Sequence, residues 1–180
     1  MAGRLIAVVG PSGAGKDTLI DAAMTARPDL VKVRRVITRP EDAGGEDFEG
    51  ISAAEFTKRV AAGGFALHWN AHGLRYGIPA AIDADLDAGR DVIFNGSRAV
   101  LPLAHTFYPT LAILHVTASP ATLAGRLAAR GRESAEEIEK RLARASYHIA
   151  PDLPVREIRN DGALEEAVAA FLAALQPESA

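Results

Sequence analysis

The sequence predicts an α/β protein of the P-loop type, in which helices cover both faces of a five-stranded parallel sheet. Residues 5–9 form an apolar run rich in Val and Ile, which is typical of a buried parallel strand. A glycine-rich segment that ends in Lys16 follows this run directly. From there on, strand-like and helix-like segments alternate, which is the pattern of a parallel sheet joined by crossover helices.

The order of elements can be given from the hydrophobic pattern and the turn residues. Five segments have strand character, at residues 5–9, 31–38, 91–94, 111–116 and 155–158. Helices are expected over residues 18–26, 52–62, 79–89, 120–131, 134–145 and 164–175. A polar, glycine-rich loop at residues 40–50 and a short strand at 65–69 interrupt the alternation.

Several helix starts carry specific signals. Ser52 with Glu55, and Ser134 with Glu137, have the spacing of a capping box. Ser119 precedes a proline, which suits an N-cap followed by Pro in the first turn. These signals place three of the helix N-termini without reference to hydrophobic periodicity.

Composition limits the classes of partner and compartment. The chain has 180 residues, a size that favours one domain, and a net charge of −3, which gives no general basic surface for nucleic acid. Cysteine is absent, so disulfides, thiolate metal sites and a cysteine nucleophile are excluded. The apolar run at the N-terminus is too short for a membrane span or signal segment. A cytoplasmic protein without nucleic-acid or membrane partners is therefore expected.

Residues 10–16 fit the phosphate-binding pattern G-x-x-x-x-G-K. Glycines let the backbone turn its N–H groups toward phosphate oxygens, and the following helix adds the positive end of its dipole. Lys16 is expected to reach the β and γ phosphates of ATP. The predicted contacts with the nucleotide are Gly10, Pro11, Ser12, Gly13, Ala14, Gly15, Lys16, Asp17 and Thr18.

Asp17 stands where most P-loops have Ser or Thr, and Thr18 follows it. A carboxylate beside phosphates is repelled unless a cation lies between them, so Asp17 is a candidate ligand of Mg²⁺. The alternative is an acidic residue that the helix dipole stabilises in the first turn. The sequence favours neither, and it predicts a phosphate contact for Thr18.

Arginines cluster in the second half of the chain. Arg126 and Arg130 are four residues apart on one predicted helix and so share a face, while Arg141 lies on the next helix. Guanidinium groups match the equatorial oxygens of a phosphoryl group in transfer. Beside a P-loop, these three residues are expected to act as a catalytic lid with Lys16. The alternative is a solvated helix face paired with the neighbouring glutamates.

A second group of four arginines and one tyrosine lies in the expected insertion and just beyond it. It comprises Arg34, Arg35, Arg39, Tyr76 and Arg98. Ser97 and Arg98 follow the strand at 91–94, at the carboxyl edge where parallel sheets bind ligands. These side chains are candidates for binding the phosphates of an acceptor.

The motifs in this order resemble those of the guanylate kinase family over nearly the whole chain. They are Gly10-Pro-Ser-Gly-Ala-Gly-Lys16, Thr38-Arg39-Pro40, Tyr76-Gly77, Arg126-Leu127, Arg130-Gly131 and Lys140-Arg141-Leu142. The resemblance implies one domain with a core at residues 1–34 and 81–180, an acceptor-binding insertion at about 35–80 and a lid at about 126–141. It also implies ATP and Mg²⁺ as cofactors, with Arg39 and Tyr76 on the acceptor phosphate.

Two departures from this family concern the acceptor. Leu67 and Ile78 stand where guanylate kinases have a carboxylate and a hydroxyl that read guanine. A site that selects its acceptor by hydrogen bonds to a base loses that selection when the bonding side chains are replaced by apolar ones. The motifs at Asp17, at Asn95-Gly-Ser-Arg98 and at Arg130-Gly-Arg-Glu133 are instead similar to the branch of the family that serves bacterial phosphonate utilisation.

That resemblance implies phosphorylation of ribose 1,5-bisphosphate to 5-phosphoribosyl 1-diphosphate, with Arg39, Tyr76, Ser97 and Arg98 on the bisphosphate. One alternative is a nucleoside monophosphate kinase with another base preference. The other is a non-catalytic binding module, against which the intact Lys16 and the lid arginines argue.

Overall fold

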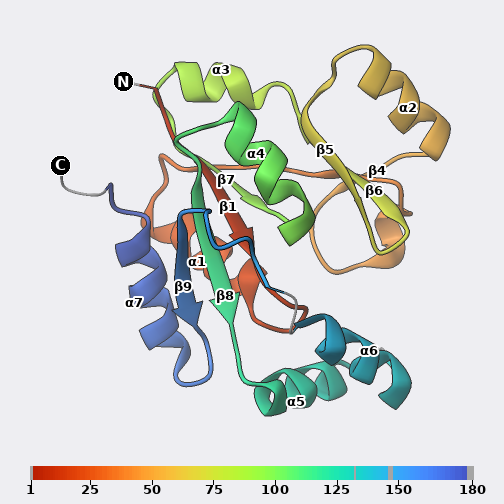
Figure 1. Cartoon of the computed structure of the whole chain (residues 1–180), viewed down its shortest axis with the longest axis vertical. Helices are drawn as coiled ribbons and strands as arrows, with labels where there is room; N and C mark the ends of the chain where they lie inside the picture. Colours follow the sequence, from red (N-terminus) through yellow and green to blue (C-terminus); the bar gives the residue numbers. More distant parts are fainter. Residues whose placement is uncertain (1, 132, 146–147, 178–180) are drawn as a thin grey trace.

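The main sheet is parallel and has five strands. The computed structural model describes residues 2–131, 133–145 and 148–177. The strands are β1 (Leu5–Val9), β2 (Val31–Lys32), β7 (Val92–Asn95), β8 (Ala112–Thr117) and β9 (Val155–Arg159), in the order β2-β7-β1-β8-β9. All four neighbouring pairs are parallel. The predicted fold class is confirmed, and β1 lies at the centre of the sheet (Figure 1).

Helices cover both faces because successive side chains of a strand point to opposite sides. Ile6 and Val8 of β1 pack in one core with α1 (Lys16–Ala26) and α7 (Leu164–Ala174). Leu5, Ala7 and Val9 pack in the other core with α3 (Ile82–Asp87) and α4 (Leu101–Phe107). The near-complete burial of β1 explains its uninterrupted apolar sequence.

A second sheet lies beside the first, on the right in Figure 1. Its strands are β4 (Glu49–Gly50), β3 (Val36–Ile37), β6 (Leu74–Pro79) and β5 (Phe65–Ala71), in that order. Strands β5 and β6 form an antiparallel hairpin, and α2 (Ala53–Ala61) precedes it. Of this hairpin the sequence predicted only the first part of β5, because the short strands of this sheet carry little periodicity of their own.

Two predictions about elements were wrong, and one helix was not predicted. Residues 31–38 are not one strand: β2 pairs with β7 of the main sheet, whereas β3 pairs with β4 and β6 of the second sheet. Pro79 ends β6 instead of opening a helix, and α3 begins at Ile82. Helix α4 was missed, because it has only seven residues and carries a proline in its first turn.

Helices α5 (Pro120–Arg130) and α6 (Ala135–Ala145) lie beyond the carboxyl ends of β1 and β8 (Figure 1). The predicted caps are confirmed: Ser119 Oγ accepts from the backbone N–H of Thr122 at 3.2 Å, and Ser134 Oγ accepts from that of Glu137 at 3.3 Å. The Glu137 carboxylate accepts from the Ser134 N–H in return, at 2.7 Å. No helix in the described part of the chain is long and apolar enough to cross a membrane.

Candidate active site

The phosphate-binding loop joins the central strand to α1, as the sequence predicted. Gly10 and Gly15 have φ values of 154° and 95°, which residues with a side chain rarely adopt. A Cβ atom at Gly10 would collide with the carbonyl oxygen of Val116, on the neighbouring strand β8. Helix α1 then begins at Lys16, so its free N–H groups face the loop.

Lys16 is the half-buried cation of this loop. Its Nζ donates to the carbonyl oxygens of Gly10 at 2.7 Å and Pro11 at 3.2 Å. The pKa of Lys16 is lowered from 10.5 to about 8, and burial is the main cause. The charges of Asp17 and Glu46 oppose this shift, while those of Arg35 and Arg130 add to it. The site thus holds an ammonium group that an arriving anion would stabilise.

This pKa predicts a pH dependence of ATP binding. Below pH 8 Lys16 is charged and attracts phosphate, whereas above pH 8 the free protein must first take up a proton. We expect the Kd for ATP to rise about fivefold between pH 8 and pH 9, since the charged fraction of the lysine falls from about one half at the pKa to about a tenth one pH unit above it. Calorimetry in two buffers of different ionisation enthalpy would also detect the proton uptake. Lys16→Arg, which stays charged, should bind without this pH dependence.

Asp17 occupies the first turn of α1, where its carboxylate accepts a hydrogen bond from Asn95 Nδ2 at 3.1 Å. Asn95 ends β7, so the strand beside β1 contributes to the same edge. Within the described residues there is no group of three or more His, Asp or Glu side chains that would hold a metal alone. One carboxylate with the Thr18 hydroxyl next to phosphate oxygens is nevertheless a donor set that suits Mg²⁺, which keeps several waters and few protein ligands.

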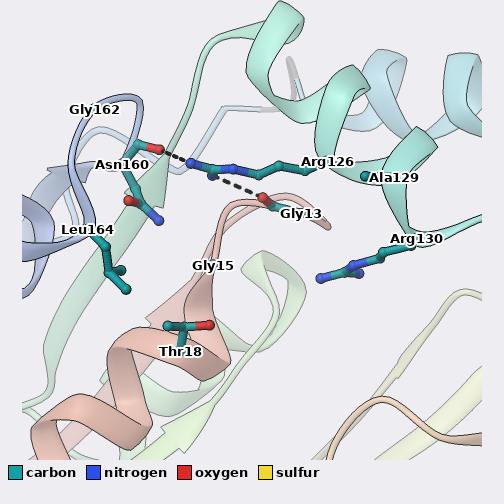
Figure 2. Close-up of a pocket in the computed structure, with 9 residues that line it drawn as sticks. All are labelled: Gly13, Gly15, Thr18, Arg126, Ala129, Arg130, Asn160, Gly162 and Leu164. Atoms are coloured by element: carbon teal, nitrogen blue, oxygen red, sulfur yellow. Dashed lines mark hydrogen bonds between the residues drawn. The ribbon is translucent and has the colours of Figure 1, made fainter.

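A pocket of about 460 Å³ lies over the loop, between α1, α5 and the segment after β9 (Figure 2). It is lined by Gly13, Gly15, Thr18, Arg126, Ala129, Arg130, Asn160, Gly162 and Leu164. Arg126 forms part of the pocket wall. Its guanidinium donates to the Gly13 carbonyl at 3.1 Å and to the Asn160 carbonyl at 2.6 Å. It therefore ties α5 to both the phosphate loop and the end of β9.

Asn160 is a site residue that sequence reasoning missed. Its side chain is buried, and Nδ2 donates to the Ala14 carbonyl at 2.8 Å. A Cβ atom at Gly15 would lie 2.5 Å from this nitrogen, so Asn160 and the glycine fit together. The signal was present, because Asn160 follows the last strand at the same carboxyl edge as Asn95.

The three lid arginines are not equally placed. Arg126 and Arg130 both line the pocket, and Arg130 acts on the pKa of Lys16. Arg141, on α6, instead pairs with Glu133 at 3.1 Å and does not line the pocket. One oxygen of Glu133, Oε2, is buried without a hydrogen-bond partner among the described residues. Arg132, within the Arg130-Gly-Arg-Glu133 motif, lies outside the described residues.

Arg39 follows β3 of the second sheet, and its charge acts on Tyr76 of the neighbouring strand β6. The Arg39 guanidinium lies 4.4 Å from the centre of the Phe48 ring and donates to the Gly44 carbonyl at 3.0 Å, while its Nε is buried with no partner among the described residues. Burial raises the pKa of Tyr76, and the charges of Arg35 and Arg39 oppose this. The Tyr76 hydroxyl therefore stays protonated at neutral pH and is able to donate.

Ser97 and Arg98 lie on the main sheet, after β7. Ser97 Oγ accepts from the N–H of Ala99 at 3.2 Å and caps the short 3₁₀ helix at Arg98–Val100. Burial lowers the pKa of His115 on β8, and the positive charge of Arg98 lowers it further. Arg98 is thus close to His115 on β8, at the carboxyl edge of the main sheet. The hydrogen bond that Ser97 makes as a cap fixes the position of its side chain.

Leu67 and Ile78, the two apolar residues that depart from the family pattern, pair with each other across the β5–β6 hairpin. They are 1% and 0% exposed and pack in the core with Ile37 and Phe48. Neither side chain offers a hydrogen-bond donor or acceptor. The hairpin therefore buries two apolar side chains in the core at the positions where a base-reading site would need polar atoms.

Comparison with known proteins agrees with this geometry. The family model "Guanylate kinase" matches residues 2–176, and the chain belongs to the guanylate kinase family. It is 51% identical to "Ribose 1,5-bisphosphate phosphokinase PhnN" of Ruegeria sp. (strain TM1040), over 99% of this chain and 94% of that protein. It is 48% identical to the protein of the same name in Agrobacterium fabrum (strain C58 / ATCC 33970), over 96% of each chain.

A solved structure supports the fold alone. The guanylate kinase of Anaplasma phagocytophilum superposes with a TM-score of 0.67 at 18% identity, covering 96% of this chain and 84% of its own. The predicted family and fold are both confirmed. The sequence similarity lies with the bisphosphate kinases, which agrees with the departures at Leu67 and Ile78.

Proposed function

We propose that this protein transfers the γ-phosphoryl group of ATP to ribose 1,5-bisphosphate, giving ADP and 5-phosphoribosyl 1-diphosphate. Full-length similarity of about half the residues to proteins named for this activity carries the proposal. The site adds two features to it. The phosphate loop, Lys16 and the α5 arginines are in place, and the β5–β6 hairpin has apolar side chains at the positions that matter for a base.

The nucleotide is assigned to the pocket of Figure 2. The phosphates lie against residues 10–18, with Lys16 on the β and γ groups and the Thr18 hydroxyl on a phosphate oxygen. Arg126 and Arg130 act on the transferring group, where they neutralise charge on its equatorial oxygens. Arg141 joins them only when it leaves Glu133, so its part depends on movement of α6 toward the loop.

The chemistry needs alignment more than proton transfer. An oxygen of the acceptor phosphate, already anionic, forms the new bond to the γ phosphorus. The bond between that phosphorus and the bridging oxygen breaks, and the electron pair leaves with ADP. No general base is required, and catalysis depends on positioning and charge neutralisation.

Mg²⁺ is proposed to be held by Asp17 together with ATP, with Asn95 orienting the carboxylate. When bound, the ion neutralises phosphate charge. Arg39, Tyr76, Ser97 and Arg98 are assigned to the bisphosphate. We further propose that residues 35–80 form the acceptor-binding part, that residues 126–141 form the lid and that the enzyme works in the cytoplasm.

A coupled assay of ADP release at saturating ATP and Mg²⁺ tests this function. We expect rapid turnover with ribose 1,5-bisphosphate and a kcat/KM for GMP at least about 100-fold lower. Leaving polar edges of guanine unpaired against Leu67 and Ile78 costs about 1–3 kcal/mol per group. Equal turnover of GMP would indicate a nucleotide kinase instead, and no turnover of any acceptor by folded protein would indicate a binding module.

A further inference from the structure

Arg35 is a buried cation with an unusual setting. The residue is 7% exposed, and its Nε donates to Glu46 Oε2 at 2.9 Å while Nη2 pairs with Glu46 Oε1. This bidentate pair uses one edge of the guanidinium. Across the described residues, no hydrogen bond extends from the remaining nitrogen, Nη1, and that atom is not among the buried unpaired ones.

The adjacent Arg34 differs from Arg35 in its own exposure and in the exposure of its carboxylate partner. Its side chain is 52% exposed and pairs with the exposed Asp47 at 3.0 Å. Residues next to each other on an extended chain point to opposite sides, which explains why one arginine faces solvent and the other the interior. The sequence grouped the two together, and the structure separates them.

The Tyr76 ring has no free face. Trp69 stacks on it nearly parallel, with ring centres 5.4 Å apart and 11° between the planes. The Arg35 guanidinium lies 5.0 Å from the centre of the same ring. Since Trp69 covers one face in parallel, Arg35 must cover the other. A nucleobase therefore has no room to stack on Tyr76 while Arg35 stays in place.

Stability does not explain the Arg35–Glu46 pair. Replacing a buried ion pair by apolar side chains of similar size is often neutral or stabilising, because desolvation offsets the attraction. The pair is also close to the phosphate loop, since Arg35 and Glu46 both act on the pKa of Lys16. Arg35 is therefore a buried cation that lies on the Tyr76 ring and whose charge reaches Lys16, a setting suited to an anion that approaches the loop.

We propose that Arg35 binds a phosphate of the acceptor through Nη1, the nitrogen that the pair with Glu46 does not use. This inference rests on the proposed function and names a further residue that binds the acceptor. Arg35 contacts the substrate in this assignment. Glu46 is a positioning residue, which orients the guanidinium through the bidentate pair and does not touch the acceptor.

The first test compares Arg35→Met with Arg34→Met, the matched control from the exposed side of the same segment. Arg35→Met should raise the KM for ribose 1,5-bisphosphate about 10- to 100-fold, the loss typical of a hydrogen bond to a charged group, and change the KM for ATP less than about twofold. Arg34→Met should leave both values unchanged. If Arg35→Met does not fold, Arg35→Lys can be measured in its place. This variant keeps the charge but loses the planar N–H donors of the guanidinium, and it should raise the acceptor KM several-fold.

The second test separates positioning from general structural damage. Glu46→Ala should raise the acceptor KM in the parent, because Arg35 loses its orientation. In the Arg35→Met background the same change should lower the acceptor KM, since it removes an unpaired anion next to an anionic substrate. Damage to the fold would raise the KM in both backgrounds, so the reversal of sign is specific to the proposal.

The outcomes distinguish this inference from the proposed function. A parent enzyme that turns over ribose 1,5-bisphosphate, with an acceptor KM that Arg35→Met or Arg35→Lys leaves within about twofold, would overturn the role of Arg35 alone. A Glu46→Ala effect of the same sign in both backgrounds would overturn the positioning role. A folded parent without activity on ribose 1,5-bisphosphate would overturn both.

Discussion

Lys16→Ala is expected to reduce phosphoryl transfer to background, a loss of at least about 100- to 1000-fold in kcat. Lys16 is the ammonium group enclosed by the phosphate loop, where its Nζ bonds the Gly10 and Pro11 carbonyls. Phosphates would replace those carbonyls as its partners, and the charge would follow the γ group as it moves. Single-turnover kinetics with excess enzyme would measure the loss in the chemical step.

The fold should survive this substitution. Burial lowers the pKa of Lys16 in the folded protein, which means that the charged form is less favourable there than in the unfolded chain. The substitution Lys16→Ala therefore removes a charge that does not stabilise the fold, and the midpoint temperature of thermal unfolding should not fall. Folded Lys16→Ala protein with activity within a few-fold of the parent would refute the catalytic role of this loop.

Arg130→Ala is expected to lower kcat about 100-fold and to leave the acceptor KM nearly unchanged. Arg130 lines the pocket and acts on Lys16, so its charge is placed for the transition state and not for acceptor binding. Steady-state kinetics with each substrate varied in turn would separate the two constants. A change confined to the acceptor KM would assign Arg130 to substrate positioning instead.

Arg126→Ala should show a matching loss in kcat with two additional effects. Its guanidinium holds the Gly13 and Asn160 carbonyls, so its removal leaves the phosphate loop less well supported. The KM for ATP should rise and the unfolding temperature should fall, whereas Arg130→Ala should change neither. The comparison of the two variants therefore distinguishes direct catalysis from support of the loop.

The main sheet and the phosphate loop were predictable because their signals are local. A buried central strand must be apolar throughout, and the turn after it requires glycines at positive φ, as at Gly10 and Gly15. Capping residues such as Ser119 and Ser134 place helix starts by their own hydrogen bonds. The apolar residues Leu67 and Ile78, compared with the family pattern, also pointed to an acceptor without a base.

The sequence by itself thus determined the fold class, the family and the phosphate loop, since each depends on residues close together in the chain. Only the tertiary structure decided which distant side chains meet. Asn160 reaches Ala14 across 146 positions, and Arg35 lies buried on Tyr76 while Arg34 is exposed. Such contacts depend on strand order and on which side of a strand a residue faces, and a short strand such as β3 has too few residues to reveal that from its own pattern.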